Sequence, residues 1–418
     1  MGCERIPKNT YNIEFPQKVE NGELKNVLLV SPEFPTQNKS RNHHDFLPIG
    51  LLRIGGYLRD NGVNIKLIHG CKEVDGEYDL IMITSLFTYW WKYVQKTVEF
   101  YRNTIDAPIV VGGIYATLLP LHCKKYVTPD HIITEPIKQT ENHTPAYDLV
   151  NVNYQIINAS RGCNRKCNFC GTYKTEPEWT YKKSIKDEII KKKIVFYDNN
   201  LLANPYIVDI LHELIDLRKQ RKINYVESQS GFDRRILLKK PILGELLYKA
   251  GFKNPKIAWD DGLKNSESVK KSINTLTNGG FKRNNIGVFM LYNYNLPFKE
   301  LEQKRIKLAE YGVQIMDSRY KPINCTSDNY NPYKKHQETG EYYIHPKWTD
   351  EEIRLFRKNS RRHNICIRTR SNWHSNKVER GKIDKDLVKH LHNCSLEEVK
   401  TVLDDIWVLT DYNGIPKN

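Results

Sequence analysis

The stretch SRGCNRKCNFCG, residues 160–171, carries three cysteines, Cys163, Cys167 and Cys170, separated by three residues and then by two. Thiols this close together outside a regular disulfide framework are more often metal ligands or redox groups than disulfide partners. Three thiolates can hold three irons of a [4Fe–4S] cluster, whereas an electron-transfer cluster uses four, so one iron would keep an open position. A zinc site usually shows a second ligand pair, and none stands nearby. A buried trio of structural cysteines is the remaining alternative, and the spacing favours the cluster.

The residues around this stretch alternate between short apolar runs and helical patterns. Strands are expected at residues 155–159, 193–197, 224–228, 256–259, 285–290 and 313–316, with helical patterns such as 206–219 and 241–250 between them. Six such units across residues 153–322 predict a partial (β/α)6 barrel, because a complete eight-unit barrel needs about 250 residues. The cysteines then lie on the loop after the first strand, at the end of the barrel where such folds keep their chemistry.

Residues 25–145 form an earlier and separate series. Apolar runs are found at residues 26–30, 64–68, 78–84 and 108–111, and helical patterns at 48–59 and 92–102. This α/β pattern predicts a doubly wound, flavodoxin-like parallel sheet with helices on both faces. Ligands of such sheets bind at the carboxyl ends of the strands. Those ends carry Ser31, His69, Thr84, Ser85, Gly112 and Gly113. Residues 1–24 are then an N-terminal extension, and 323–418 a small basic C-terminal region.

Composition excludes several classes of protein. Of the 418 residues, 39% are hydrophobic and 27% charged, which excludes a mostly disordered chain. No apolar stretch approaches the ~20 residues that span a bilayer, and no signal-peptide pattern follows the first charges. Nine cysteines, an odd number and mostly scattered, indicate a reducing compartment. We therefore expect a cytoplasmic protein with no membrane partner.

The net charge of +16 is partly concentrated near the carboxyl end. Between residues 351 and 385, eleven Lys and Arg stand against four Asp and Glu, with Trp373 and His374 among them. Cations interleaved with aromatic rings suit a phosphate backbone and stacked bases. The same run is also typical of a solvated helical face, so the sequence leaves nucleic acid open as a partner.

The cysteine spacing, with Phe169 directly before the last cysteine, resembles the signature of radical S-adenosylmethionine (SAM) enzymes over residues 153–320. The resemblance implies that SAM binds the open iron, and that an electron from an external flavodoxin- or ferredoxin-type donor cleaves it to methionine and a 5′-deoxyadenosyl radical. It also implies SAM contacts from Phe169, Asp198, Asn199, Ser228, Ser230, Asp260 and Met290. The Gly-Gly-Glu run that usually binds the SAM amino group is missing, so Asp198 and Asn199 would substitute for it. Taken singly, such polar residues also suit turns and strand ends.

The front domain resembles the cobalamin-binding domain that precedes the barrel in a large subgroup of these enzymes, on residues 48–59 and 109–117. The resemblance implies a cobalamin (B12) site near Thr84, Ser85, Gly112 and Gly113, where glycine lets the backbone approach the cofactor. The Asp-x-His-x-x-Gly run that ligates cobalt is absent, and residues 68–70 are its nearest counterpart. A methylthiotransferase-type front domain would instead need an auxiliary cluster, for which the available cysteines fit poorly: Cys3, Cys71 and Cys123.

Three classes of function are consistent with these patterns. The first is a cobalamin-dependent radical SAM enzyme, a methyltransferase or other transferase that methylates or rearranges an unactivated carbon. The second is a radical SAM enzyme that modifies a DNA or RNA base through the basic C-terminal region, with or without cobalamin. The third is a non-catalytic iron–sulfur protein that binds nucleic acid, against which the intact cysteine spacing on a predicted barrel argues. Candidates for contact with a substrate radical are Tyr292, Tyr320 and Cys325.

Overall fold

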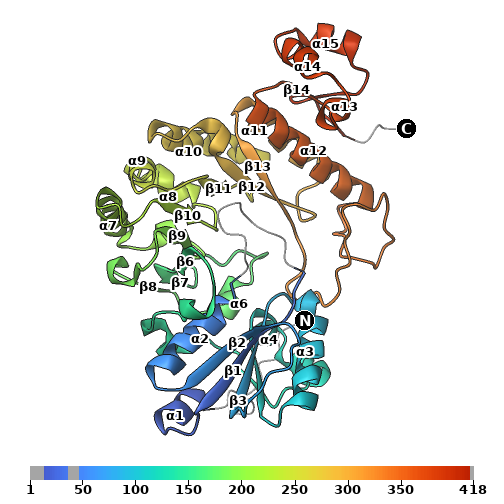
Figure 1. Ribbon diagram of the computed structural model, residues 1–418. Helices are drawn as coiled ribbons and strands as arrows, with labels where there is room; N and C mark the ends of the chain where they lie inside the picture. Colours follow the sequence, from blue (N-terminus) through green and yellow to red (C-terminus); the bar gives the residue numbers. More distant parts are fainter. Residues whose placement is uncertain (1–13, 36–46, 415–418) are drawn as a thin grey trace. The chain divides into compact units, whose positions relative to one another are not determined.

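The computed structural model describes residues 14–35 and 47–414 (Figure 1). The chain divides into two compact units. Unit 1 comprises the described residues up to Tyr181 together with Asp187–Ile194 and Pro322–Asn329. Unit 2 comprises Lys182–Lys186, Val195–Lys321 and the described residues from Tyr330 onward. The division falls after the cysteine stretch, so the three cysteines belong to the same unit as the front sheet. Cys3 and most of the expected N-terminal extension lie outside the described residues.

Unit 1 is built on a five-stranded parallel sheet in the order β2-β1-β3-β4-β5. Its strands are β1 (Asn26–Ser31), β2 (Asn64–His69), β3 (Leu80–Ser85), β4 (Ile109–Gly113) and β5 (His131–Ile132). The helices connecting them are α1 (Phe15–Glu20), α2 (Ile49–Asp60), α3 (Trp91–Thr104), α4 (Ile114–Leu118) and α5 (Pro120–Tyr126). This architecture confirms the predicted doubly wound parallel sheet.

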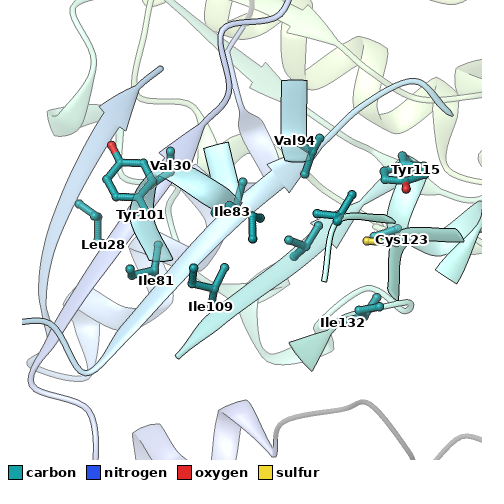
Figure 2. Packing of buried hydrophobic residues seen from close by; sticks show 14 of the residues in the cluster. Leu28, Val30, Ile81, Ile83, Val94, Tyr101, Ile109, Tyr115, Cys123 and Ile132 are labelled. Atoms are coloured by element: carbon teal, nitrogen blue, oxygen red, sulfur yellow. The ribbon is translucent and has the colours of Figure 1, made fainter. Parts of the chain in front are cut away.

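Both faces of this sheet are buried because successive side chains of each strand point to opposite faces. Leu28 and Val30 lie in one apolar cluster, with Val94 of α3, as Figure 2 shows. Val27 and Leu29 lie in a second cluster, which α1 and α2 cover from the other face. Burial on both faces is the reason that these strands read as continuous apolar runs in the sequence.

The segment expected to be a linker packs against the front sheet instead of standing free. Unit 1 continues through η1 (Thr88–Trp90), η2 (Lys138–Asn142), η3 (Tyr147–Leu149), β6 (Tyr154–Ile157), β7 (Ser160–Arg161), α6 (Thr172–Thr175) and β8 (Thr180–Tyr181). A Cβ atom on Gly56 of α2 would lie 2.1 Å from the carbonyl oxygen of Thr144. The Ala146 amide donates to the carbonyl of Leu52, also in α2, at 2.8 Å. Glycine in α2 therefore serves the close approach of this segment.

Unit 2 contains the later strands of the predicted barrel. β9 (Lys193–Phe196), which crosses the unit boundary, neighbours β10 (Tyr225–Ser228). A parallel three-stranded sheet contains β11 (Lys256–Ala258), β12 (Gly287–Tyr292) and β13 (Gln314–Arg319). Between them lie η4 (Lys186–Glu188), η5 (Leu201–Ala203), α7 (Ile207–Lys219), α8 (Arg234–Lys239), α9 (Ile242–Lys249), η6 (Leu263–Asn265), α10 (Ser266–Asn278), η7 (Arg283–Asn285) and α11 (Phe298–Glu310). With β6, all six expected strands are present, while their closure into one barrel stays a prediction.

The C-terminal region is more ordered than its sequence pattern indicates. The long helix α12 (Asp350–Thr369) begins at a capping box, in which the Thr349 hydroxyl accepts from the Glu352 amide and the Glu352 carboxylate accepts from the Thr349 amide. A small subdomain follows, with β14 (Trp373–Ser375), α13 (Asn376–Glu379), α14 (Lys385–Leu391), α15 (Leu396–Val402) and β15 (Ile406–Val408) around its own apolar core. Within residues 14–35 and 47–414, no helix has the length and apolarity needed to cross a membrane.

Candidate cluster and cofactor site

The cysteine loop is tied at its base by a short antiparallel ladder between β7 and β8, which pairs Ser160 with Tyr181 and Arg161 with Thr180. Gly162 follows β7 with a φ of 71°, and a Cβ atom there would lie 2.2 Å from the carbonyl oxygen of Glu178. The Gly162 amide donates to the Glu176 carboxylate at 2.8 Å. The two ends of the loop are therefore joined by backbone pairing, close packing and one charge-assisted hydrogen bond.

The three predicted cluster ligands lie on this loop as half-exposed thiols. The Arg165 amide donates to the Cys163 sulfur at 3.3 Å, and the Cys170 amide to the Cys167 carbonyl at 3.0 Å. The Cys170 thiol donates to the Thr172 hydroxyl at 3.2 Å, and as a thiolate it would accept from the same group. Polar groups thus surround the sulfurs in a way that suits their ionised form.

The donor set fits an iron–sulfur cluster, because thiolates are the ligands such clusters take. Elsewhere Cys123 lies fully buried in the apolar cluster of Figure 2, and burial raises the pKa of its thiol to about 12, so it suits no auxiliary cluster. Throughout the described part of the chain, no three His, Cys, Asp or Glu side chains converge closely enough to hold a metal ion. The cluster ligands are thus gathered on one loop without forming a finished cage.

The four residues predicted beside cobalamin come together at the adjacent ends of β3 and β4, where Thr84 pairs with Gly112 and Ser85 with Gly113. Ser85 is buried, and its hydroxyl donates to the Gly112 carbonyl at 2.7 Å while accepting from the Ala116 amide at 3.1 Å. Its hydroxyl is thereby used within the protein. Gly113 has a φ of 100°, and a Cβ atom there would lie 2.3 Å from the Ser85 carbonyl oxygen.

Apolar surface surrounds this edge of the sheet. Phe87, directly after β3, is 40% exposed, and Ile114, directly after β4, is 42% exposed. The Phe87 ring stacks on that of Tyr89 with 5.2 Å between centroids, and packs edge-on against Trp90. A glycine edge flanked by exposed apolar side chains can accept a large planar cofactor such as a corrin. His69, the counterpart of a cobalt ligand, is exposed at the end of the edge strand β2.

The cysteine loop reaches the same edge within unit 1. Helix α4, which starts immediately after Gly113, packs against α6, which starts immediately after Gly171. A Cβ atom on Gly171 would lie 3.5 Å from Ile323 and 4.0 Å from Leu118. The segment around Ile323 is held to the front domain because the Thr88 hydroxyl donates to the Cys325 carbonyl at 2.6 Å. The predicted cluster ligands and the predicted cobalamin edge are therefore neighbours.

In unit 2, three of the predicted SAM contacts meet at the carboxyl ends of β9 and β10. The Ser230 hydroxyl donates to the Asp198 carbonyl at 2.5 Å, and the Ser228 hydroxyl donates to the Ser230 carbonyl at 3.0 Å. Asp198 is completely buried and Asn199 beside it is exposed. These contacts brace the strand ends, while Asn199 and Ser230 remain accessible on them.

Asp260 lies on a loop after β11 that buried cations hold in place. The ammonium of Lys304, fully buried, donates to the carbonyls of Trp259 at 2.8 Å and Asp261 at 3.0 Å. Arg234 donates to the Ala258 carbonyl at 3.1 Å and pairs with the Asp261 carboxylate. Burial lowers the pKa of Lys304 to about 8, and partial desolvation raises the pKa of Asp260, whose side chain is still solvent-accessible. Sequence reasoning selected Asp260 and missed the cations that position it.

Met290 is placed differently from the other predicted contacts. It is fully buried, and its neighbour on the same face of β12, Tyr292, packs on Phe356 of α12 with 5.1 Å between ring centroids. Phe289 and Leu291 point to the opposite face and are half-exposed. Of the radical candidates, Tyr292 is buried, whereas Tyr320 is half-exposed with its ring centroid 4.4 Å from that of Tyr294.

The basic run near the carboxyl end is largely neutralised by the fold. Arg354 pairs with Asp350 at 2.9 Å, Arg361 pairs with Glu379, and Lys377 pairs with Asp404 at 2.7 Å. Over residues 350–414, thirteen Lys and Arg stand against eleven Asp and Glu. The local excess of positive charge seen in the sequence is therefore much smaller in the folded region.

Comparison with known proteins gives a likeness of fold. No family model matches the chain, and no curated protein matches it in sequence. Two solved structures of TsrM from Kitasatospora setae, a radical S-adenosylmethionine methyltransferase, are similar to it with a TM-score of 0.55 and sequence identities of 12% and 13%. The matches cover 72% of this chain and 77% and 75% of TsrM. One of those structures holds cobalamin and a [4Fe–4S] cluster, and the other holds tryptophan substrate and a SAM analogue.

Proposed function

We propose that this protein is a cobalamin-dependent radical SAM enzyme that methylates an unactivated carbon. Cys163, Cys167 and Cys170 would hold a [4Fe–4S] cluster, and the edge of the front sheet at Gly112 and Gly113 would hold cobalamin. The observation that carries the proposal is the packing of α4 against α6, which brings the cysteine loop beside that edge. A reaction that passes a group between two cofactors needs them held close together. The TsrM-like fold supports the same conclusion.

The cofactors supply the chemistry when bound: reductive cleavage of SAM at the cluster and methyl transfer from the corrinoid. The chain holds and orients them. Gly113 lets the backbone approach the corrinoid, and Phe87 and Ile114 cover it with apolar surface. Phe169, Asp198, Asn199, Ser228, Ser230 and Asp260 are proposed to contact SAM. Met290, buried on the α12 face, would act through packing.

The proposal includes a reducing cytoplasmic environment and an external one-electron donor, since a low-potential cluster needs both. A nucleic-acid substrate takes second place, because Glu379, Asp404 and Asp350 neutralise much of the basic run that suggested it. A non-catalytic role takes third place, because the loop keeps all three cysteines beside a probable group-transfer edge of glycines and apolar side chains.

The test is anaerobic reconstitution of the full chain with iron and sulfide, followed by incubation with SAM, dithionite and methylcobalamin. We expect about four irons per chain, corrinoid absorbance after gel filtration, and 5′-deoxyadenosine or S-adenosylhomocysteine as product. Cys163→Ala, Cys167→Ala and Cys170→Ala should each abolish both iron binding and SAM cleavage. Cys71→Ala, a half-exposed cysteine outside the loop, is the control and should change neither. Absence of iron and of SAM cleavage in the wild type would contradict the enzyme assignment, and absence of corrinoid alone would contradict the cobalamin part.

A further inference from the structure

A chain of alternating charges runs from the front domain to the cysteine loop within unit 1. It begins at Arg53 of α2, which is 9% exposed. One guanidinium nitrogen of Arg53 forms an ion pair with Glu141 in η2, and another donates to the Asn158 side-chain oxygen at 2.8 Å. Glu141 also lies 3.8 Å from the guanidinium of Arg161 in β7.

The chain ends on the backbone next to the first cysteine. Arg161 pairs with Glu176 at 2.6 Å, and the second oxygen of Glu176 accepts from the Gly162 amide at 2.8 Å. The side chains of Arg161, Glu141 and Glu176 are only 27%, 25% and 19% exposed, so these charges interact more strongly than exposed pairs do. Two positive and two negative groups alternate, so the network is formally neutral only while all four are present.

The position of Glu141 is fixed by α2. Arg59 of α2 pairs with Asp148 at 2.6 Å, and Asp60 pairs with His143 at 2.8 Å, on either side of the Thr144 carbonyl that packs on Gly56. The segment that carries Glu141 is therefore held along the helix. A displacement of α2 would reach Arg161 through Glu141.

We propose that Arg161 is a positioning residue for the iron–sulfur cluster, and that Arg53 and Glu141 link its position to helix α2 of the front domain. This rests on the proposed function, because it requires the cluster at Cys163. Groups just outside the ligands of a metal site orient those ligands and tune the metal. Here Arg161 holds Glu176, Glu176 holds the Gly162 amide, and Gly162 directly precedes the cysteine.

The network makes a prediction that loss of packing alone does not. Arg161→Gln removes a positive charge near the cluster and leaves two carboxylates, so the reduction potential should fall. Glu176→Gln removes a negative charge with almost no change in shape, so the potential should rise. Both variants should lose iron to a chelator about tenfold faster than the wild type, the lower end of the range for such outer groups. Arg53→Met should shift the potential in the same direction as Arg161→Gln, by less.

The loop supplies a matched control. Glu178 lies two residues from Glu176 and pairs with Lys138 of η2 at 2.9 Å, but the two side chains are 65% and 78% exposed. Solvent screens such a pair, so Glu178→Gln should leave the potential and the chelation rate near those of the wild type. Arg161→Lys keeps the charge but loses the forked geometry, so it should keep the potential and still lose iron faster.

The experiment is an EPR-monitored redox titration of each reconstituted variant, with iron release to a chelator and thermal unfolding measured on the same samples. Opposite shifts of the potential in Arg161→Gln and Glu176→Gln, with Glu178→Gln unchanged, would support the inference. Shifts in the same direction, or potentials and iron release like those of the wild type, would overturn it while leaving the proposed function intact. A wild-type protein that holds no iron would overturn the proposed function, and this inference with it.

Discussion

Replacement of Gly162 by alanine should abolish cluster binding, although the change adds only one methyl group and touches no cysteine. Gly162 has a φ of 71°, in the left-handed region, where an alanine costs about 1–2 kcal/mol more than a glycine. The added Cβ atom would lie 2.2 Å from the carbonyl oxygen of Glu178. Real Cβ atoms stay at least 3.0 Å from such atoms, so the two strands at the loop base must separate by about 0.8 Å.

That separation would break the hydrogen bond from the Gly162 amide to Glu176, which contributes about 1 kcal/mol more. The sum is about 2–3 kcal/mol against the loop conformation, which corresponds to a loss of roughly thirty- to hundredfold in its population. Iron content after reconstitution, measured per folded chain, is the assay. The urea midpoint of the same protein checks that unit 1 remains folded.

Gly171 at the other end of the loop is the matched control. Its φ is −86°, an ordinary helical value, and an added Cβ atom would meet Ile323 at 3.5 Å and Leu118 at 4.0 Å, which are normal contacts. Gly171→Ala should therefore bind iron like the wild type and be neutral or slightly more stable, since alanine restricts the unfolded chain. Full iron occupancy in Gly162→Ala, or equal loss in both variants, would refute the reasoning from backbone geometry.

Two further predictions concern buried charges in unit 2. Arg305→Met should destabilise the protein by about 3–5 kcal/mol in urea unfolding, because it leaves the fully buried carboxylate of Glu302 without its partner at 2.8 Å; a change below 1 kcal/mol would contradict this. Desolvation raises the pKa of Asp317 to about 6, against an opposing effect of Arg357. The folded state then binds a proton that the unfolded state has lost between the ordinary value of 3.8 and about 6, so stability from this group falls as pH rises through that interval. Asp317→Asn should raise the melting temperature relative to the wild type at pH 7.5 and leave it unchanged at pH 4; an equal shift at both values would exclude titration as the cause.

The front sheet could be predicted because its signal is local. Every residue from Val27 to Ser31 is buried, since helices cover both faces of the sheet, and burial on both faces gives an unbroken apolar run. The strands of unit 2 were predicted for the same reason. The cysteine loop carries an equally local signal in its spacing. These features need no knowledge of which distant segments meet.

The positioning groups of the site could not be predicted, because their partners are far apart in the sequence. Arg53 and Glu141 are separated by 88 residues, and Lys304 reaches back to the carbonyl of Trp259. Nothing in the residues beside Arg53 marks it as one end of a charge network. Met290 illustrates a different difficulty: strand alternation places it on one of two faces, but only the packing of α12 shows which face is covered.

Helix α12 was missed although its first turn carries a capping-box pattern. Its buried face includes Asn359, Ser360 and His363, which made the amphipathic pattern look polar throughout. His363 is completely buried, and its Nε2 atom hydrogen-bonds the Val313 carbonyl oxygen at 2.8 Å. Burial lowers the pKa of this histidine to about 3, so it is neutral at physiological pH and behaves as a core residue. Hydropathy alone cannot identify a polar side chain whose hydrogen bonds are supplied by a neighbouring strand.

Buried cations perform one task in both units: they hold irregular backbone where no strand or helix can. Arg305 donates to the carbonyls of Leu409 and Asp411 at 2.6 and 2.5 Å, and Lys304 does the same for the loop that presents Asp260. Carbonyls in such segments have no ladder partner, and leaving them unpaired would cost about 1–3 kcal/mol each. A buried cation can satisfy two at once, and its own desolvation is offset by nearby carboxylates. Loops built in this way keep one conformation before a ligand arrives. The same argument applies to the cysteine loop through Arg161, which explains why charged groups outside the ligand set should control how firmly a cluster is held.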